Sequence, residues 1–144
     1  MHSENETLLF LVDDDAVFLK SLEIEFRRAY DFKIETFATG ELCVDGLERN
    51  PDVIVLDYHL NGIVKNAMNG METLNKIKSH NSAIPVIMLS SQDKIDVAVN
   101  CMHHKAFDYV VKSETAFLRL QKIIANIFRY KKIEGELSWY MERM

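Results

Sequence analysis

Acidic side chains follow two of the short apolar runs in this sequence. One run is followed directly by Asp13, Asp14 and Asp15, and another by Asp57. We expect Asp15 to cap a helix, the common role of an aspartate that directly precedes one. The other three carboxylates would repel one another if they met, so they call for a cation. Hard oxygen ligands suit Mg²⁺, which retains waters and accepts phosphate oxygens, with Mn²⁺ as the alternative ion.

A hydroxyl and an amine end two further apolar runs. These side chains belong to Ser90 and Lys112, and both types bind phosphoryl oxygens. The charges of Asp13, Asp14 and Asp57 would be balanced by one Mg²⁺ and the Lys112 ammonium before a phosphoryl group arrives. Phosphoryl transfer depends mainly on positioning and charge neutralisation. The four chain segments together therefore predict phosphoryl chemistry.

These side chains meet only if the runs preceding them are neighbouring parallel strands. Apolar runs of this length are typical of strands buried on both faces, and the segments between them carry apolar residues at helical spacing. The expected strands are Leu8–Val12, Lys33–Phe37, Val53–Leu56, Val86–Leu89 and Phe107–Val111. One helical stripe comprises Ile95, Ala98, Val99 and Met102. The alternation predicts an α/β fold, a flavodoxin-like doubly wound five-stranded parallel sheet with helices on both faces. Sites in such sheets lie beyond the carboxyl ends of the strands.

Composition narrows the class of protein further. A chain of 144 residues with 48% apolar residues is the size of one globular domain. The net charge of −5 argues against direct nucleic-acid binding, which needs a positive field. No apolar run approaches the length of a membrane span, and Met1–Glu6 lacks the basic start of a signal peptide. Two cysteines make no disulfide framework, so we expect a cytoplasmic protein with no membrane partner.

From roughly Leu8 to Tyr130 the chain resembles the receiver domain of bacterial two-component response regulators. The matching stretches are Leu8–Asp15, Pro51–Asp57, Pro85–Ser91 and Ala106–Lys112. The resemblance implies a receiver domain over 1–130, with 131–144 as a C-terminal helical extension or linker. It also implies a switch rather than a turnover enzyme. A sensor histidine kinase or phosphotransfer protein would phosphorylate it, and it would regulate a partner or output domain.

The resemblance assigns the acidic residues their individual roles. Asp57 would be the phosphoacceptor. Asp13, Asp14, Asp57 and the backbone carbonyl of His59 would hold Mg²⁺.

The remaining site residues would bind, report and retain the phosphoryl group. By the same resemblance, Ser90 and Lys112 would contact its oxygens, and Tyr109 would change rotamer together with Ser90. His59 and Gln92 occupy the positions that tune the lifetime of the aspartyl phosphate.

Three features depart from the family pattern. Asn61–Ala67 contains about five extra residues, which suits a tolerated surface loop or, alternatively, a lid or partner contact beside the site. Ser113 follows Lys112 where the family has proline, and a cis bond there would cost about 2.5–4 kcal/mol. Lys105 stands where the family has glycine, which predicts strain if the backbone turns left-handed.

A different enzyme class offers an alternative interpretation. The run from Asp13 to Val17 fits the nucleophile motif of haloacid-dehalogenase-type phosphatases, with Asp13 as nucleophile. That family needs an acidic pair on a later strand, and this chain has only Glu114 before Glu134. The interpretation also leaves Asp57 without a role.

The end of the chain carries an apolar stripe of its own. Ile133, Leu137, Tyr140 and Met144 are spaced as one face of a helix, with Gly135 as a weak point. We expect this face to pack against a second copy, as a homodimer, or against an output domain. The alternative is that the tail folds back on its own domain.

Overall fold

Strands and helices alternate along the whole chain, as the apolar runs predict. A computed structural model describes residues 7–143. The elements in order are β1 (Leu8–Val12), α1 (Ala16–Ala29), β2 (Lys33–Phe37), α2 (Gly40–Asp45), the 3₁₀ turn η2 (Leu47–Arg49), β3 (Val53–Asp57), α3 (Gly70–His80), β4 (Val86–Ser90), α4 (Ile95–His103), β5 (Asp108–Val111) and α5 (Ala116–Arg143). Two strands extend one residue further than predicted, so that Asp57 and Ser90 are the last residues of β3 and β4.

The five strands form one parallel sheet in the order β2-β1-β3-β4-β5. This order confirms the flavodoxin-like fold, in which the chain reverses its winding direction between β1 and β3. Val12 at the end of β1 pairs with Leu56 of β3, so the residues that follow, Asp13 and Asp57, lie side by side. The strand register therefore places the acidic residues that follow β1 next to Asp57 at the end of β3.

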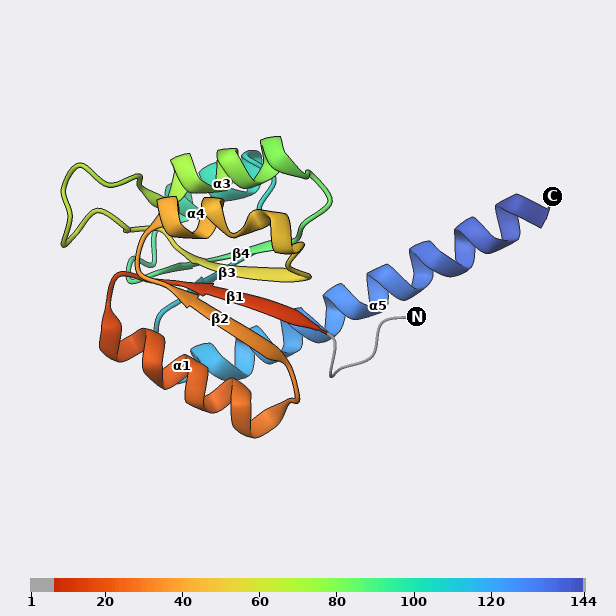
Figure 1. Ribbon diagram of the computed structural model, residues 1–144, viewed down its shortest axis with the longest axis horizontal. Coiled ribbons are helices and arrows are strands. Elements are labelled where there is room, and N and C mark those ends of the chain that lie inside the picture. The colour runs from red at the N-terminus through yellow and green to blue at the C-terminus, as the bar shows by residue number, and fades with distance from the viewer. Residues whose placement is uncertain (1–6, 144) are drawn as a thin grey trace.

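Two apolar layers cover the two faces of the sheet. Along β1, Leu9 and Leu11 pack with α1 and α5, whereas Phe10 and Val12 pack with α2, α3 and α4. Figure 1 shows α1 and α5 on one side of the sheet and α3 and α4 on the other. Successive side chains of a strand point to opposite faces, so a strand covered on both faces needs an apolar residue at every position. In the sequence it appears as a continuous apolar run.

The helix starts near the site are fixed by side-chain caps. The Asp15 carboxylate accepts hydrogen bonds from the backbone N–H groups of Val17 and Phe18, which confirms the expected cap of α1. Asn69 and Glu72 form a reciprocal capping box at the start of α3. Both caps hold the chain where it leaves the carboxyl edge of the sheet.

α4 ends in a left-handed turn at Lys105, whose φ is 71°. The Lys105 N–H donates to the carbonyl of Met102, and the Ala106 N–H donates to that of Cys101. This is the Schellman pattern, in which glycine is the favoured left-handed residue. The expected strain at Lys105 is therefore present. Lys112–Ser113 is trans, as are all other peptide bonds described.

Much of the apolar stripe of α4 faces away from the core. Ile95, Val99 and Met102 are 83%, 60% and 46% exposed, whereas Cys101 is completely buried. The helix therefore packs on the sheet through a narrow contact and leaves an apolar outer face.

α5 continues as one helix past Tyr130 and Gly135 to Arg143. The predicted helical tail is thus present, whereas the domain division at 130/131 stays a prediction. Every residue from 131 to 143 is exposed, so the tail does not fold back on its domain. Met144 and Met1–Glu6 lie outside the described residues. None of the described helices is long and apolar enough to cross a membrane.

Replacing Lys105 with glycine should stabilise the domain. A left-handed conformation costs an ordinary L-residue about 1–2 kcal/mol, which glycine does not pay. We expect Lys105→Gly to raise the free energy of unfolding in urea by about 1 kcal/mol. Lys105→Ala removes the same charge but keeps the side-chain clash, so it should give no such gain. Equal stabilisation by both variants would show that charge, not backbone strain, is responsible.

Candidate functional site

Three carboxylates meet at the carboxyl edge of the sheet. Asp13 and Asp14 follow β1, Asp57 ends β3, and the three residues offer oxygens that all lie within 4.8 Å of one another. Asp13 and Asp57 are only 1% and 2% exposed, and Asp14 is half-buried. The site therefore contains two nearly water-free acids with one more accessible acid beside them.

Lys112 joins the two buried acids. Its Nζ lies 2.8 Å from an oxygen of Asp13 and 3.4 Å from one of Asp57. It also lies 4.8 Å from the ring centroid of Phe18, within range of a cation–π contact. Burial favours the neutral amine, but hydrogen bonding and charge from Asp13 and Asp57 outweigh burial and raise the pKa of Lys112. Lys112 therefore stays an ammonium.

Asp57 is the most perturbed carboxyl group in the site. Burial and the neighbouring Asp13 carboxylate raise its pKa to about 7, although Lys112 and a hydrogen bond from the His59 N–H act in the opposite direction. The site thus destabilises the bare carboxylate of Asp57. Added positive charge, or a covalent bond to Asp57 oxygen, would relieve that cost.

Ser90 and Tyr109 are connected through the loop between β4 and α4. Ser90 is fully buried, and its Oγ accepts a hydrogen bond of 3.0 Å from the Gln92 N–H. The Tyr109 hydroxyl donates to the carbonyl of Gln92. One residue, Gln92, therefore contacts both Ser90 and Tyr109.

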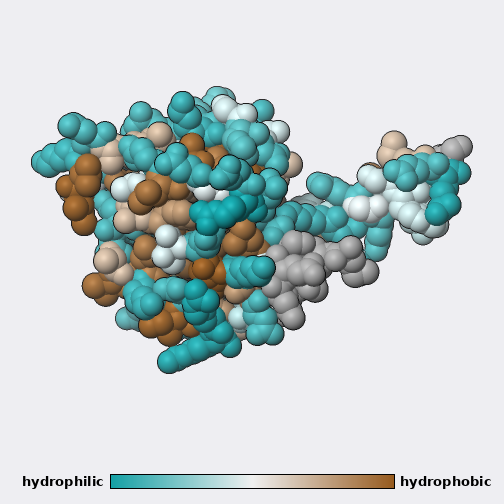
Figure 2. All heavy atoms as spheres, in the orientation of Figure 1, coloured by the Kyte–Doolittle hydropathy of each residue, from teal (hydrophilic) through white to brown (hydrophobic). Residues whose placement is uncertain are grey.

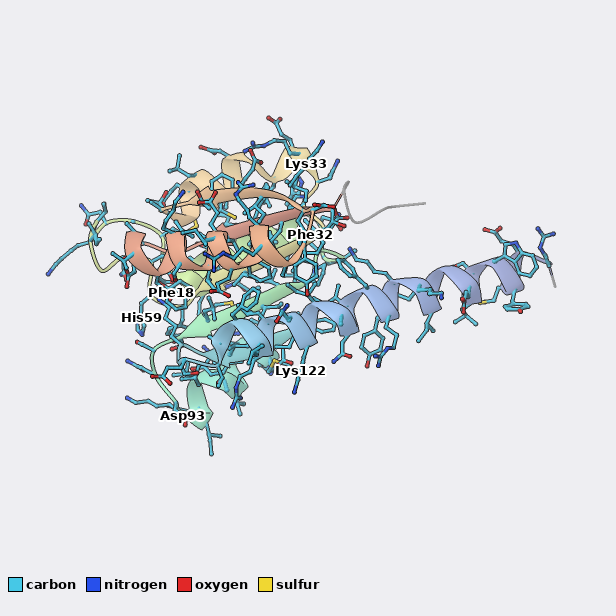
Figure 3. All side chains as sticks on the ribbon, turned by 90° about the horizontal axis from the view of Figure 1, so that it is seen from below. Phe18, Phe32, Lys33, His59, Asp93 and Lys122 are labelled. Atoms are coloured by element: carbon cyan, nitrogen blue, oxygen red, sulfur yellow. The ribbon has the colours of Figure 1, made fainter. Side chains whose placement is uncertain are left out.

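His59 lies at the same end of the sheet as the acids. Its side chain is exposed, and its N–H donates to Asp57 Oδ1 at 3.4 Å. Figure 3 shows His59 and Phe18 near the base of the long loop that follows β3. This position suits a side chain that contacts groups entering the site from solvent.

The inserted loop Asn61–Ala67 reaches the acidic cluster. The Gly62 N–H donates to Asp14 Oδ2 at 3.1 Å. The loop projects beyond the other elements at the carboxyl edge (Figure 1), and hydrophobic surface gathers on it in Figure 2. That surface includes Ile63 and Val64, which are 74% and 53% exposed.

The loop returns to the domain at Gly70. Any side chain here would clash with the backbone, because a Cβ would lie 2.5 Å from the carbonyl oxygens of both Asp57 and Tyr58. The Gly70 N–H also donates to the Tyr58 carbonyl. Glycine at this position therefore lets the loop close directly behind the end of β3.

The donor set fits Mg²⁺. It consists of carboxylate oxygens and contains no histidine or cysteine ligand among residues 7–143, as hard divalent cations prefer. Burial and then the neighbouring Asp13 carboxylate raise the pKa of Asp57, so a bound cation would stabilise its ionised form. Asp13, Asp14 and Asp57 are the side chains that would hold the ion.

A family profile described as the response regulator receiver domain matches residues 9–125. The chain belongs to this family. As a receiver domain it is 39% identical over 111 residues to the transcriptional regulatory protein AfsQ1 of Streptomyces coelicolor, covering 74% of this chain and 44% of the relative. The chain spans less than half the length of other curated relatives that it matches.

Solved structures show the same fold. NtrX from Brucella abortus matches with a TM-score of 0.81 and 22% identity, covering 95% of this chain and 30% of that one. The CheX-CheY-BeF3-Mg²⁺ complex from Borrelia burgdorferi matches with a TM-score of 0.74 and 25% identity, covering 85% and 89%. The receiver fold and the two-component class of signalling protein are thereby shown.

Two contacts in the site were not predicted from the sequence. Phe18, interpreted only as part of the helical stripe, lies beneath the Lys112 ammonium. Gly62 contacts Asp14 through its backbone N–H, which no side-chain pattern signals. The glycine itself was the available clue, since a close backbone approach favours a residue without Cβ.

Measured Mg²⁺ affinity should distinguish the roles of the neighbouring residues Asp14 and Asp15. Asp14→Ala removes a ligand, so we expect a loss of affinity at least as large as the roughly tenfold that an outer-shell partner supplies. Asp15→Ala should leave Mg²⁺ affinity nearly unchanged but lower the free energy of unfolding by about 1 kcal/mol, because it removes the cap of α1. Isothermal titration and urea unfolding of both variants measure the two effects. Equal losses of affinity would contradict the assignment.

The ionisation of Asp57 should make metal-free stability depend on pH. The folded state binds this proton more tightly, so it loses stability as the pH rises from about 4, the unfolded pKa, to about 7. Asp57→Asn cannot ionise and should be more stable than wild type by a few kcal/mol at pH 8, with the difference shrinking toward pH 4. Urea unfolding of both proteins in a chelating buffer, repeated between pH 4 and pH 8, measures this difference in the free energy of unfolding. A difference independent of pH would refute the raised pKa.

Proposed function

We propose that Asp57 accepts a phosphoryl group from the phosphohistidine of a sensor histidine kinase or phosphotransfer protein. The observation that carries the proposal is the position of its carboxylate, 3.4 Å from the Lys112 ammonium and within the acidic cluster at the edge of the sheet. An Asp57 oxygen attacks phosphorus, the bond from phosphorus to the histidine nitrogen breaks, and the imidazole leaves with its electron pair.

The other residues of the site prepare Asp57 for this attack. Asp13 and Asp14, with the His59 carbonyl, hold Mg²⁺, which supplies charge neutralisation to the phosphoryl oxygens when bound. The BeF3-Mg²⁺ complex of the Borrelia burgdorferi neighbour supports this choice of ion. Lys112 pairs with a phosphoryl oxygen in place of part of its contact with Asp57.

Phosphorylation acts on the rest of the domain through Ser90. The phosphoryl group offers the Ser90 hydroxyl a new acceptor and competes with its contact to Gln92, to which Tyr109 is also bonded. Ser90 and Tyr109 then change conformation together. The population shift is limited by how differently the phosphoryl group contacts the two states. The exposed apolar face of α4, beside β5 and α5, is the surface that carries the change to a partner or output domain.

His59 and Gln92 set the lifetime of the aspartyl phosphate. Both follow their strand ends by two residues, and both lie where water reaches the site, with His59 exposed and Gln92 half-buried. Their side chains orient or exclude the hydrolytic water. The domain is therefore a switch that loads and unloads one phosphoryl group, not a turnover enzyme.

The phosphatase alternative finds no support in the site. Both oxygens of Asp13 already have partners, since one accepts from the Asp15 N–H and the other pairs with Lys112. That alternative leaves Asp57 idle, although Asp57 belongs to the carboxylate cluster and contacts Lys112. The buried, unpaired Cys43 and Cys101 favour action in the reducing cytoplasm, and burial raises the pKa of both thiols.

Incubation with acetyl phosphate and Mg²⁺ should add one phosphoryl group to the intact protein. We expect the mass increase to disappear in Asp57→Asn and to return to baseline in the wild type after removal of the donor. Intact-mass spectrometry measures both. Asp108→Asn, which changes a half-buried aspartate on β5 remote from the cluster, serves as the control and should label normally.

Label that persists in Asp57→Asn but is lost in Asp13→Asn would overturn the proposal in favour of the phosphatase chemistry. Absence of label in the wild type, with Mg²⁺ binding demonstrated, would also contradict it.

A further inference from the structure

The apolar residues of α5 move to a different side of the helix where it leaves the domain. Within the domain the helix buries Leu120, Ile124 and Ile127. The same face beyond this point would carry Lys131, Glu134 and Ser138, which are polar. The apolar residues instead occupy the positions one residue before those, on a face rotated by about 100° around the helix. The tail therefore presents a second apolar face, which starts at Tyr130 beside the Phe107 ring and continues beyond the domain.

This second face repeats with the spacing of a coiled coil. Tyr130, Ile133, Leu137 and Tyr140 alternate in steps of three and four residues, the a and d positions of two heptads. Each of these side chains is between 50% and 62% exposed, and the helix extends straight away from the domain (Figure 1). Gly135 falls on the far side, where an added Cβ would meet nothing within 4 Å. We call the face formed by Tyr130, Ile133, Leu137 and Tyr140 the seam. The weak point of the helix therefore lies outside the seam.

The charges beside the seam distinguish the possible orientations. In a parallel pair, Arg129 lies opposite Glu134 of the second copy, because each g position faces the following e position. An antiparallel pair that matches the same four apolar residues would set Arg129 against Arg143 and Glu136 against Glu136. Opposite charges therefore favour the parallel arrangement, and like charges disfavour the other.

We propose that residues 129–143 pair with the same segment of a second copy as a parallel two-stranded coiled coil. The pairing places both receiver domains at the same end of the coil. Two heptads bury a small area, so the dimer forms in a concentration-dependent manner. The proposal concerns a surface remote from Asp57 and does not rest on phosphorylation.

Sedimentation equilibrium of the full chain tests the seam. We expect a monomer–dimer equilibrium in the wild type and a dissociation constant at least about tenfold higher in Leu137→Glu, since two charges would then meet in an apolar layer. Ser138→Glu adds the same charge one position outside the seam and should dimerise as the wild type does. Both positions are exposed, so both variants keep the folded domain. A wild type that stays monomeric at the highest attainable concentration overturns the proposal, as does equal weakening by both variants.

Charge reversal tests the orientation. Arg129→Glu and Glu134→Arg should each weaken the dimer, and the double variant should restore it, because the pair is then reversed but still opposite in sign. In the antiparallel arrangement, Arg129→Glu alone would strengthen the dimer by meeting Arg143. That result would overturn the parallel assignment.

A cysteine at the seam provides a second, geometric measurement. Leu137→Cys should form an intermolecular disulfide under mild oxidation, since equal a positions face each other only in a parallel pair in register. Trp139→Cys, on the outer side of the helix, should cross-link far more slowly. The native Cys43 and Cys101 are fully buried and do not compete. Equal cross-linking of both variants would contradict the seam.

Discussion

The structure depends on the enforced closeness of two buried carboxylates. Asp13 and Asp57 lie on adjacent strands at 1% and 2% exposure, where neither water nor distance reduces their repulsion. Lys112, which follows β5 at the edge of the sheet, contacts both and offsets part of that cost. The remaining cost, due first to burial and then to the Asp13 carboxylate, appears in the raised pKa of Asp57. A divalent cation at this edge would reduce the same cost.

The sheet order decides which groups surround this pair. Because the winding direction reverses between β1 and β3, the loops on either side diverge and leave the strand ends accessible. One of these loops carries the insertion Asn61–Ala67, which starts beside Asp57, touches Asp14 through Gly62 and closes at Gly70. Access to Asp57 is thus shaped by a segment that contacts Asp14, another member of the acidic cluster.

α5 serves two surfaces with one uninterrupted helix. Its first half fills the core beneath the sheet, and its second half carries apolar residues on a face rotated by about 100°. The second half extends beyond the domain with this face exposed, so the two parts of the helix present different apolar surfaces. Gly135 weakens the helix by up to about 1 kcal/mol relative to alanine but lies away from both surfaces.

The fold class, the edge of the sheet that carries the site and the acidic and amine groups that meet there could be predicted from the sequence. These follow from local patterns, because buried parallel strands require continuous apolar runs and their ends must share one edge. The face that α4 turns to the sheet could not be predicted, since Ile95 and Val99 have the spacing of core residues yet are exposed. The same holds for the Gly62–Asp14 hydrogen bond and the Phe18–Lys112 contact. Such contacts join residues far apart in the chain, and their geometry depends on how elements pack rather than on any periodicity within one element.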